Sequence, residues 1–170
     1  MMNVLIVDGY NIIGAWEELQ KIKEIDLGQA RDYLVELMAD YQAYLGYHVI
    51  IVFDAYYVPG AESKQKPYQL DVIYTRENET ADECIERLVK VHKNISNQVY
   101  VATSDFLEQR ITFGRGALRK SARELFIELK EIKKEIGEEI TLHKKKIPQS
   151  KIDLNEEVLE AFEKWRRGDK

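Results

Sequence analysis

Short runs of apolar residues alternate along the chain with longer amphipathic segments. Asn3–Val7 and His48–Phe53 are rich in valine and isoleucine and show no alternation with polar residues. This composition is typical of parallel strands that are covered on both faces. Leu70–Tyr74 and Gln98–Ala102 are predicted to be the third and fourth strands.

The amphipathic segments between these runs predict helices. After Ala30 apolar residues recur at every third or fourth position, and Gly46 is expected to end that helix. Thr80 stands three residues before Glu83, which is the spacing of a capping box at a helix start. The other expected elements are helices over residues 12–22, 81–93, 122–137 and 155–166, a short helix from residue 105 and a short strand at 140–142.

Strands that alternate with helices predict an α/β fold. Right-handed crossovers place helices on both faces of a mainly parallel sheet, which gives three layers, α/β/α. The chain has 170 residues and a mass of 19.9 kDa, a common size for one domain. We expect residues 1–146 to form this domain. Residues 147–170 are predicted to be a polar connector and a helix that docks on the same domain.

Four acidic residues fall where strands end or the next helix begins. Asp8, Asp54 and Asp105 follow the first, second and fourth strands, and Asp82 opens the helix after the third. Because parallel strands have their carboxyl ends at one edge, these carboxylates are expected to converge there. Such oxygens suit Mg²⁺ or Mn²⁺, which can clamp a phosphodiester and activate water, so the pattern predicts a nuclease centre. Taken singly, each acid is also typical of a turn or of a helix start.

Two further residues are candidates for supporting roles. Glu79 stands three residues before Asp82 across the helix start, and both carboxylates are expected to approach the same ion. Asn11 is interpreted as a hydrogen-bond partner of Asp8 or of a substrate phosphate, with helix capping as the alternative.

Basic residues cluster in two parts of the chain. The stretch GRGALRKSAR is interpreted as a phosphate-binding rim or, alternatively, as a solvated basic face. The segment after the second strand interleaves tyrosines with cations, which favours contact with single-stranded bases or else a loop with half-buried tyrosines. The predicted RNA-binding residues are Lys64, Lys66, Arg76, Arg110, Arg115, Arg119, Lys120 and Arg123.

Composition and missing motifs exclude several classes. The net charge of −5 argues against a protein that coats nucleic acid by bulk attraction. No apolar run approaches the roughly 20 residues of a membrane span, and no secretion signal is evident, so we expect a cytoplasmic protein without a membrane partner. Cys84 is the only cysteine and is interpreted as a packing residue. Neither a dinucleotide loop nor a GxxxxGK[ST] motif is present, so no nucleotide cofactor is expected.

The blocks VDGYNIIGAW, VIIVFDA, ENETADECIERL, VYVATSD, GALRKSARELF and FEKWRRGD resemble the YacP-like branch of the NYN domains, within the PIN-like nucleases. The resemblance covers essentially the whole chain. It implies a PIN-like fold and a metal-dependent endoribonuclease that cleaves mRNA at the translating ribosome, with in-line attack by a metal-activated water. By position it assigns Mg²⁺ or Mn²⁺ binding to Asp8, Asp82 and Asp105. Asn11, Asp54 and Glu79 are the expected supporting catalytic residues.

Two alternatives belong to other classes. One is a catalytically silent RNA-binding or ribosome-binding module with the same fold, in which the basic and aromatic residues matter and the acids do not. The other is a phospho-receiver domain, since Asp54 ends a central strand and Thr103 and Ser104 end a later one. A receiver normally carries adjacent acids after its first strand, whereas Asp8 is followed by glycine.

Overall fold

The computed structural model of the chain describes residues 2–55, 70–94, 96–105 and 116–145. The chain divides into two compact units, Met1–Lys130 and Glu131–Lys170, and the last described helix begins in the first and continues into the second. The sheet and the candidate site belong to the first unit. The described elements are β1 (Met2–Asp8), α1 (Gly9–Ala15), α2 (Glu17–Ile25), α3 (Leu27–Leu45), β2 (His48–Phe53), β3 (Asp71–Tyr74), α4 (Ala81–His92), β4 (Asn97–Ala102), β5 (Leu118–Lys120) and α6 (Ala122–Lys145).

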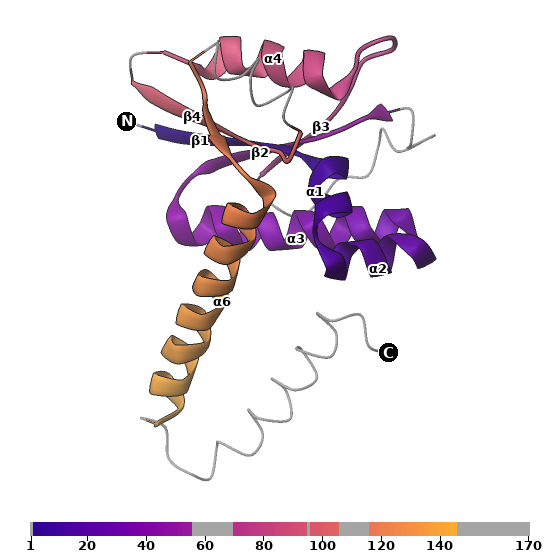
Figure 1. Cartoon of the computed structure of the whole chain (residues 1–170). Coiled ribbons are helices and arrows are strands. Elements are labelled where there is room, and N and C mark those ends of the chain that lie inside the picture. Colours follow the sequence, from indigo (N-terminus) through magenta and orange to yellow (C-terminus); the bar gives the residue numbers. More distant parts are fainter. Residues whose placement is uncertain (1, 56–69, 95, 106–115, 146–170) are drawn as a thin grey trace. The chain divides into compact units, whose positions relative to one another are not determined.

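The five described strands form one parallel sheet in the order β3-β2-β1-β4-β5 (Figure 1). The central strand β1 pairs with β2, where Asp8 is opposite Val52, and with β4, where Val7 is opposite Ala102. The chain winds outward from β1 to β3 and then crosses to the other side of β1 for β4 and β5. This reversal creates a topological switch point between the carboxyl ends of β1 and β4, where ligands collect in open α/β sheets.

The strand order also decides against the phospho-receiver alternative. Receivers have the order 2-1-3-4-5, in which the switch point lies between the first and third strands. Here β2 and β3 are neighbours on one side of β1, and β4 lies on the other. The receiver interpretation is therefore wrong.

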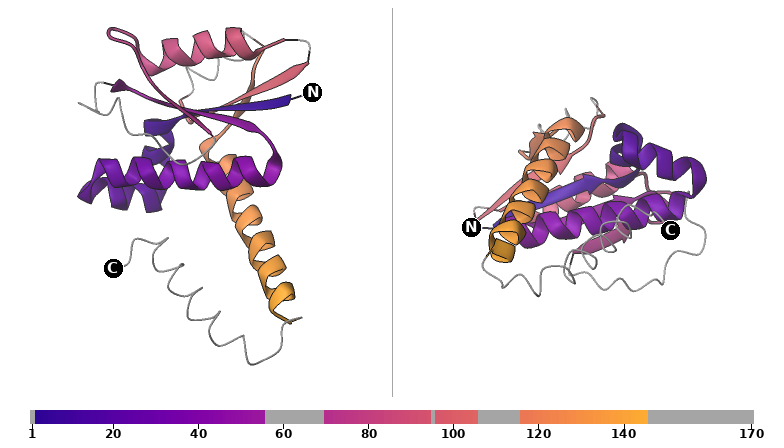
Figure 2. Two further views of the ribbon diagram at one scale, coloured as in Figure 1. Left: turned by 180° about the vertical axis from the view of Figure 1, so that it is seen from behind. Right: turned by 90° about the horizontal axis from the view of Figure 1, so that it is seen from below.

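Helix α4 covers one face of the sheet and helices α1 to α3 cover the other (Figures 1 and 2). On the α4 face, Val4 and Ile6 of β1 belong to one buried cluster with Ile85. Leu5 and Val7 point to the opposite face, because side chains alternate along a strand, and they are fully buried as well. Burial on both faces confirms the predicted three-layer α/β/α fold and explains why β1 lacks a polar alternation.

Two local helix signals in the sequence are confirmed. The Oγ1 atom of Thr80 accepts a hydrogen bond from the backbone N–H of Glu83 (3.2 Å) and caps α4. Gly46 ends α3 in the left-handed region, at φ 73°, and its N–H donates to the backbone oxygen of Gln42 (2.8 Å). None of the described helices combines the length and apolar character needed to cross a membrane.

The helix predicted over residues 12–22 is two helices, α1 and α2, separated at Trp16. Trp16 has an extended backbone (φ −98°, ψ 121°) and a buried side chain, and its Nε1–H donates to the backbone oxygen of Ala122 (2.8 Å). The indole ring also lies 5.6 Å from the ring of Phe126. The break serves a contact with residues more than 100 positions away, which periodicity cannot reveal.

Two short elements differ from expectation. The strand predicted at residues 140–142 is wrong, because α6 continues through them to Lys145. The three residues of β5 lie in the basic stretch GRGALRKSAR, where no strand was predicted, and they pair with β4 at the edge of the sheet. The predicted connector and docking helix of residues 147–170 and most of the short helix expected from residue 105 lie outside the described residues.

Candidate functional site

The switch point is lined by the ends of β1 and β4. Asp8 is the last residue of β1, and 8% of its surface is exposed. Thr103 directly follows β4 and is fully buried, and its N–H donates to the backbone oxygen of Lys120 in β5 (3.1 Å). Its Oγ1 accepts from the N–H of Asp105 (3.0 Å). Thr103 thus fixes the turn that carries Asp105 beside the end of β1.

Asn11 connects the two strand ends across the switch point. Its Oδ1 atom accepts from the backbone N–H of Ser104 (2.6 Å) and from the Ser104 hydroxyl (2.8 Å). Because both donors reach the oxygen, the NH₂ group of the same amide is directed away from Ser104. The contact ties the start of α1, and with it the turn after Asp8, to the segment that leads to Asp105.

Asp54 follows β2, the strand beside β1, and is half-buried. Thr75 holds this strand end: its N–H donates to the backbone oxygen of Phe53 (3.0 Å), and its Oγ1 accepts from the amide that follows Asp54 (2.9 Å). Gly9 lies against the same segment, and a Cβ atom there would stand 2.3 Å from the Phe53 ring. Glycine is therefore required for the β1–α1 turn to approach β2 this closely.

The topology brings the four predicted acids to one edge of the sheet. Asp8 is the last residue of β1, and Asp54 and Asp105 follow the strands on either side of it, β2 and β4. Asp82 lies in the first turn of α4, the helix that leaves the sheet after β3. Their shared location agrees with the expectation from the sequence. Their catalytic roles remain predictions.

The donor chemistry at this edge suits a hard divalent cation, because carboxylate oxygens are the ligands that Mg²⁺ and Mn²⁺ prefer. Asp8, Asp82 and Asp105 each interact with other groups of the chain. Within the described ranges, no three histidine, cysteine, aspartate or glutamate side chains are grouped closely enough to hold an ion. The types of residue fit a metal site, whereas a three-carboxylate ligand set is not assembled in this conformation.

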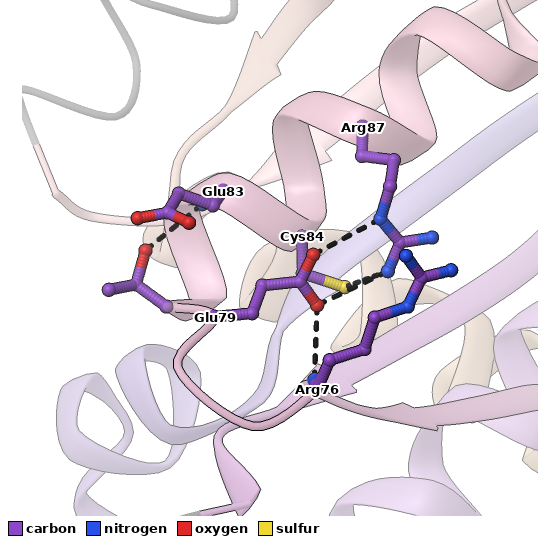
Figure 3. Close-up of polar contacts among 6 residues, drawn as sticks. Arg76, Glu79, Glu83, Cys84 and Arg87 are labelled. Atoms are coloured by element: carbon purple, nitrogen blue, oxygen red, sulfur yellow. Dashed lines mark hydrogen bonds and ion pairs between the residues drawn. The ribbon is translucent and has the colours of Figure 1, made fainter.

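Glu79 is engaged in contacts other than those expected of a metal ligand (Figure 3). Its Oε2 accepts from Nε of Arg87 (3.1 Å), and its Oε1 accepts from Nη2 of Arg87 (3.2 Å) and from the backbone N–H of Arg76 (3.1 Å). The Arg87 guanidinium holds the pKa of Glu79 below its ordinary value of 4.5. These contacts favour a structural role for Glu79, in which it fixes the turn before α4, over the predicted catalytic role.

Arg87 was not among the residues predicted for this site. Its Nη2 also contacts the Sγ atom of Cys84 (3.5 Å), which is fully buried, as expected of a packing residue. Burial raises the pKa of the Cys84 thiol. The sequence spacing could have indicated this contact, because Arg87 lies three residues after Cys84 and both are therefore on the same side of α4.

Replacing Arg87 with methionine is expected to destabilise the first unit by about 1–3 kcal/mol, because the largely buried Glu79 carboxylate loses its charged partner. The lowered pKa of Glu79 means that this stabilisation is present above about pH 4.5 and is lost as the pH falls through the lower folded-state value. Urea unfolding of the variant and the parent chain should therefore differ near neutral pH, and the difference should be smaller near pH 3. Lys90→Met, on an exposed position of α4, is the control. An equal difference at both pH values would contradict this role for the pair.

The described basic residues differ in exposure. Arg76, Arg119 and Arg123 are exposed. Arg119 lies in β5 and Arg123 in the first turn of α6, next to the carboxyl end of β4. The other four predicted RNA-binding residues, Lys64, Lys66, Arg110 and Arg115, lie outside the described residues.

The assignment of Lys120 to an RNA-binding rim is corrected by the structure. Lys120 is 8% exposed, and its Nζ pairs with Oε1 of Glu128 (2.6 Å) and donates to Oη of Tyr41 (3.2 Å). The same ammonium lies 5.1 Å from the centre of the Tyr100 ring. Side chains alternate along β5, so Arg119 faces solvent and Lys120 faces the interior. The Lys120 charge is therefore used within the fold.

Comparison with known proteins identifies the family. The sequence profile of the YacP-like NYN domain matches residues 5–167. The chain belongs to the YacP-like NYN domain family. It is 52% identical over 168 residues to the uncharacterized protein YacP of Bacillus subtilis (strain 168), and the match covers 99% of each chain.

Solved structures agree with this membership. The crystal structure of Rae1 (YacP) from Bacillus subtilis matches with a TM-score of 0.82 and 52% identity, over 99% of this chain and 97% of that one. A mutant of Rae1 (YacP) with leucine in place of a tryptophan matches with a TM-score of 0.77 and 48% identity over the same shares. The five described parallel strands are consistent with the expected PIN-like fold. Membership of this NYN family supports a nuclease-like, RNA-related role.

Proposed function

We propose that this YacP-like protein is a divalent-metal-dependent endoribonuclease that cleaves mRNA in association with the translating ribosome. One observation carries the proposal: at the topological switch point, the poorly exposed Asp8 and the turn to Asp105 are tied together by Asn11 and Ser104. A ligand is expected to bind at this position in an open α/β sheet. In a family of nucleases, that ligand is the RNA phosphodiester.

In this proposal Asp8, Asp82 and Asp105 hold Mg²⁺ or Mn²⁺. When bound, such an ion supplies Lewis-acid activation of water and of the phosphodiester. The protein contributes fixed geometry, because the Asn11–Ser104 contact holds two strand ends in place. The exposed cations Arg119 and Arg123, next to the end of β4, attract the RNA backbone.

Metal binding is tested on the purified chain, because chelation in a translation reaction would also stop the ribosome. Calorimetric titration with Mn²⁺ is expected to show binding to the parent chain and at least about a tenfold loss of affinity in Asp82→Asn, which removes one charged oxygen ligand. Asp71→Asn, which removes an exposed carboxylate on the outer strand β3, is expected to keep its affinity within about twofold. Equal affinities in the parent chain and Asp82→Asn would overturn the assignment of that ligand.

The cleavage activity itself is tested by mapping RNA ends in a reconstituted translation reaction with and without the protein. New ends with a 5′-phosphate and a 3′-hydroxyl are expected only when the protein is present. The alternative is a silent RNA-binding or ribosome-binding module with the same fold. Sedimentation of the protein with ribosomes without any new RNA end, in the presence of Mn²⁺, would establish that alternative.

A further inference from the structure

Three side chains from separate elements meet beside the switch point, and none was among the predicted site residues. Tyr10 lies in the first turn of α1, Arg31 in α3, and Tyr74 is the last residue of β3. The Nη1 of Arg31 donates to the phenol oxygen of Tyr10 (3.2 Å). Arg31 also acts electrostatically on Tyr74, and Asp54 acts on Tyr10. We refer to these three residues as the Tyr10–Arg31–Tyr74 patch.

The two tyrosine rings are positioned by a buried ring at the end of β2. The Phe53 ring is fully buried, and its centre lies 5.2 Å from that of Tyr10 and 5.9 Å from that of Tyr74. The Tyr74 ring is stacked on Phe53 with an angle of 29° between planes. Both tyrosines are only half-buried. Part of each ring is therefore exposed in a position set by the core, which lowers the entropy lost when a ligand binds.

The charge of Arg31 completes the chemistry of the patch. Burial raises the pKa of both Tyr10 and Tyr74, so both phenols are neutral near pH 7. The hydrogen bond to a neutral phenol orients the guanidinium and does not neutralise it. Arg31 is half-buried and retains donors suited to a phosphate oxygen. A fixed cation beside two half-buried aromatic rings is a combination that binds the backbone and bases of single-stranded RNA.

We propose that the Tyr10–Arg31–Tyr74 patch is a binding subsite for one nucleotide of single-stranded RNA next to the phosphate at the switch point. Arg31 contacts a phosphate, and the exposed part of the Tyr74 ring stacks with an unpaired base. Tyr10 stands two residues after Asp8, at the start of α1, so the subsite lies near the carboxyl end of β1 on the side of β2. The inference rests on the proposed function for the identity of the ligand. Stacking makes the site tolerant of base sequence and selective against duplex RNA, whose bases are stacked on one another.

Binding of a fluorescein-labelled single-stranded RNA, measured by fluorescence anisotropy, tests the subsite. All variants carry Asp8→Asn, so that cleavage does not interfere. Tyr74→Leu is expected to weaken binding by about 5- to 100-fold, because a stacked base loses its aromatic partner, whereas Tyr74→Phe keeps it. Arg31→Gln is expected to weaken binding about tenfold and to reduce the slope of log affinity against log salt by about 0.7, the value for one phosphate contact in a single strand.

Matched controls separate this role from a purely structural one. Tyr33→Leu removes another half-buried tyrosine of α3, whose hydroxyl donates to Glu18 (3.0 Å), and Lys23→Gln removes an exposed cation of α2. Both are expected to bind RNA as tightly as the Asp8→Asn parent. A lower melting temperature for Tyr74→Leu with unchanged RNA affinity would show that the patch only packs the fold.

The outcome for the subsite is separate from that for the proposed function. Cleavage of translated mRNA is scored with Asp8 intact, whereas the subsite is scored by binding of free RNA. If the chain cleaves translated mRNA and the Arg31 and Tyr74 variants bind free RNA as the parent does, the subsite fails and the proposed function stands. If the parent binds no free single-stranded RNA, the subsite fails as well. If binding depends on the patch and no cleavage occurs, the subsite stands and the nuclease proposal fails.

Discussion

Asp8→Asn is expected to reduce the cleavage of translated mRNA by about 10²- to 10³-fold or more, the loss typical of removing one fixed electrostatic contact to the reacting group. Asp8 lies at the centre of the switch point and is only 8% exposed, so solvent screens its charge only weakly. Asparagine keeps the shape of the side chain and removes the charge. The rate at which new RNA ends appear, measured by primer extension, reports the effect.

The matched control for Asp8→Asn lies on an outermost strand of the sheet. Asp71 opens β3, is exposed and pairs with His48 at the start of β2 (2.7 Å), and β2 separates it from β1. Asp71→Asn is expected to leave the cleavage rate within about twofold, as usual for surface substitutions away from a site. Circular dichroism and thermal melting check that both variants are folded. Full activity of folded Asp8→Asn would remove the switch point from the mechanism.

The second large effect is expected on stability. Glu128→Ala should destabilise the first unit by about 2–3 kcal/mol, because it leaves the ammonium of Lys120 poorly exposed and without its carboxylate partner. Tyr41 would remain as a neutral acceptor (3.2 Å), and the Tyr100 ring (5.1 Å) would give only weak compensation. For a unit of this size the melting temperature should fall by about 5–10 °C. Urea and thermal unfolding provide the measurement.

A double variant and a control make this prediction specific. Lys120→Met combined with Glu128→Leu removes both charges and is expected to recover most of the lost stability, since a buried ion pair replaced by apolar groups is often neutral or better. Lys130 lies over the ring of Phe126 (4.7 Å) but is exposed, so Lys130→Met should cost less than about 1 kcal/mol. Equal losses in Glu128→Ala and Lys130→Met would show that Lys120 is not held by its charge partner.

Local sequence patterns predicted the features of the fold that local forces decide. The apolar runs located four of the five described strands, since a strand buried on both faces tolerates few polar residues. Thr80 and Gly46 marked helix ends because capping depends on backbone groups within a few residues. The alternation of these elements then led to a parallel sheet, and the parallel sheet to acids at one edge. The short strand β5 was not predicted, because three residues are too few to show the periodic pattern of a strand.

The roles of individual charged residues depended on contacts between distant positions. Nothing local distinguishes Lys120 from Arg119, yet one side chain is enclosed by groups from α3, β4 and α6 and the other is exposed. In the sequence Glu79 was paired with Asp82 across the helix start, but its carboxylate is bound by Arg87, about two turns into α4. Trp16 separates two helices where the apolar pattern predicted one, and its indole N–H donates to the backbone oxygen of the distant Ala122.

The sequence by itself determined the α/β class, most strands and helix ends, and the family to which the chain belongs. The strand order, with its switch point between β1 and β4, and the choice of which charges are buried came only from the tertiary structure. The physical reason is how far apart along the chain the interacting groups lie. Backbone conformation and capping are decided over a few residues, whereas desolvation and pairing of a charged group are decided by whichever distant elements pack around it.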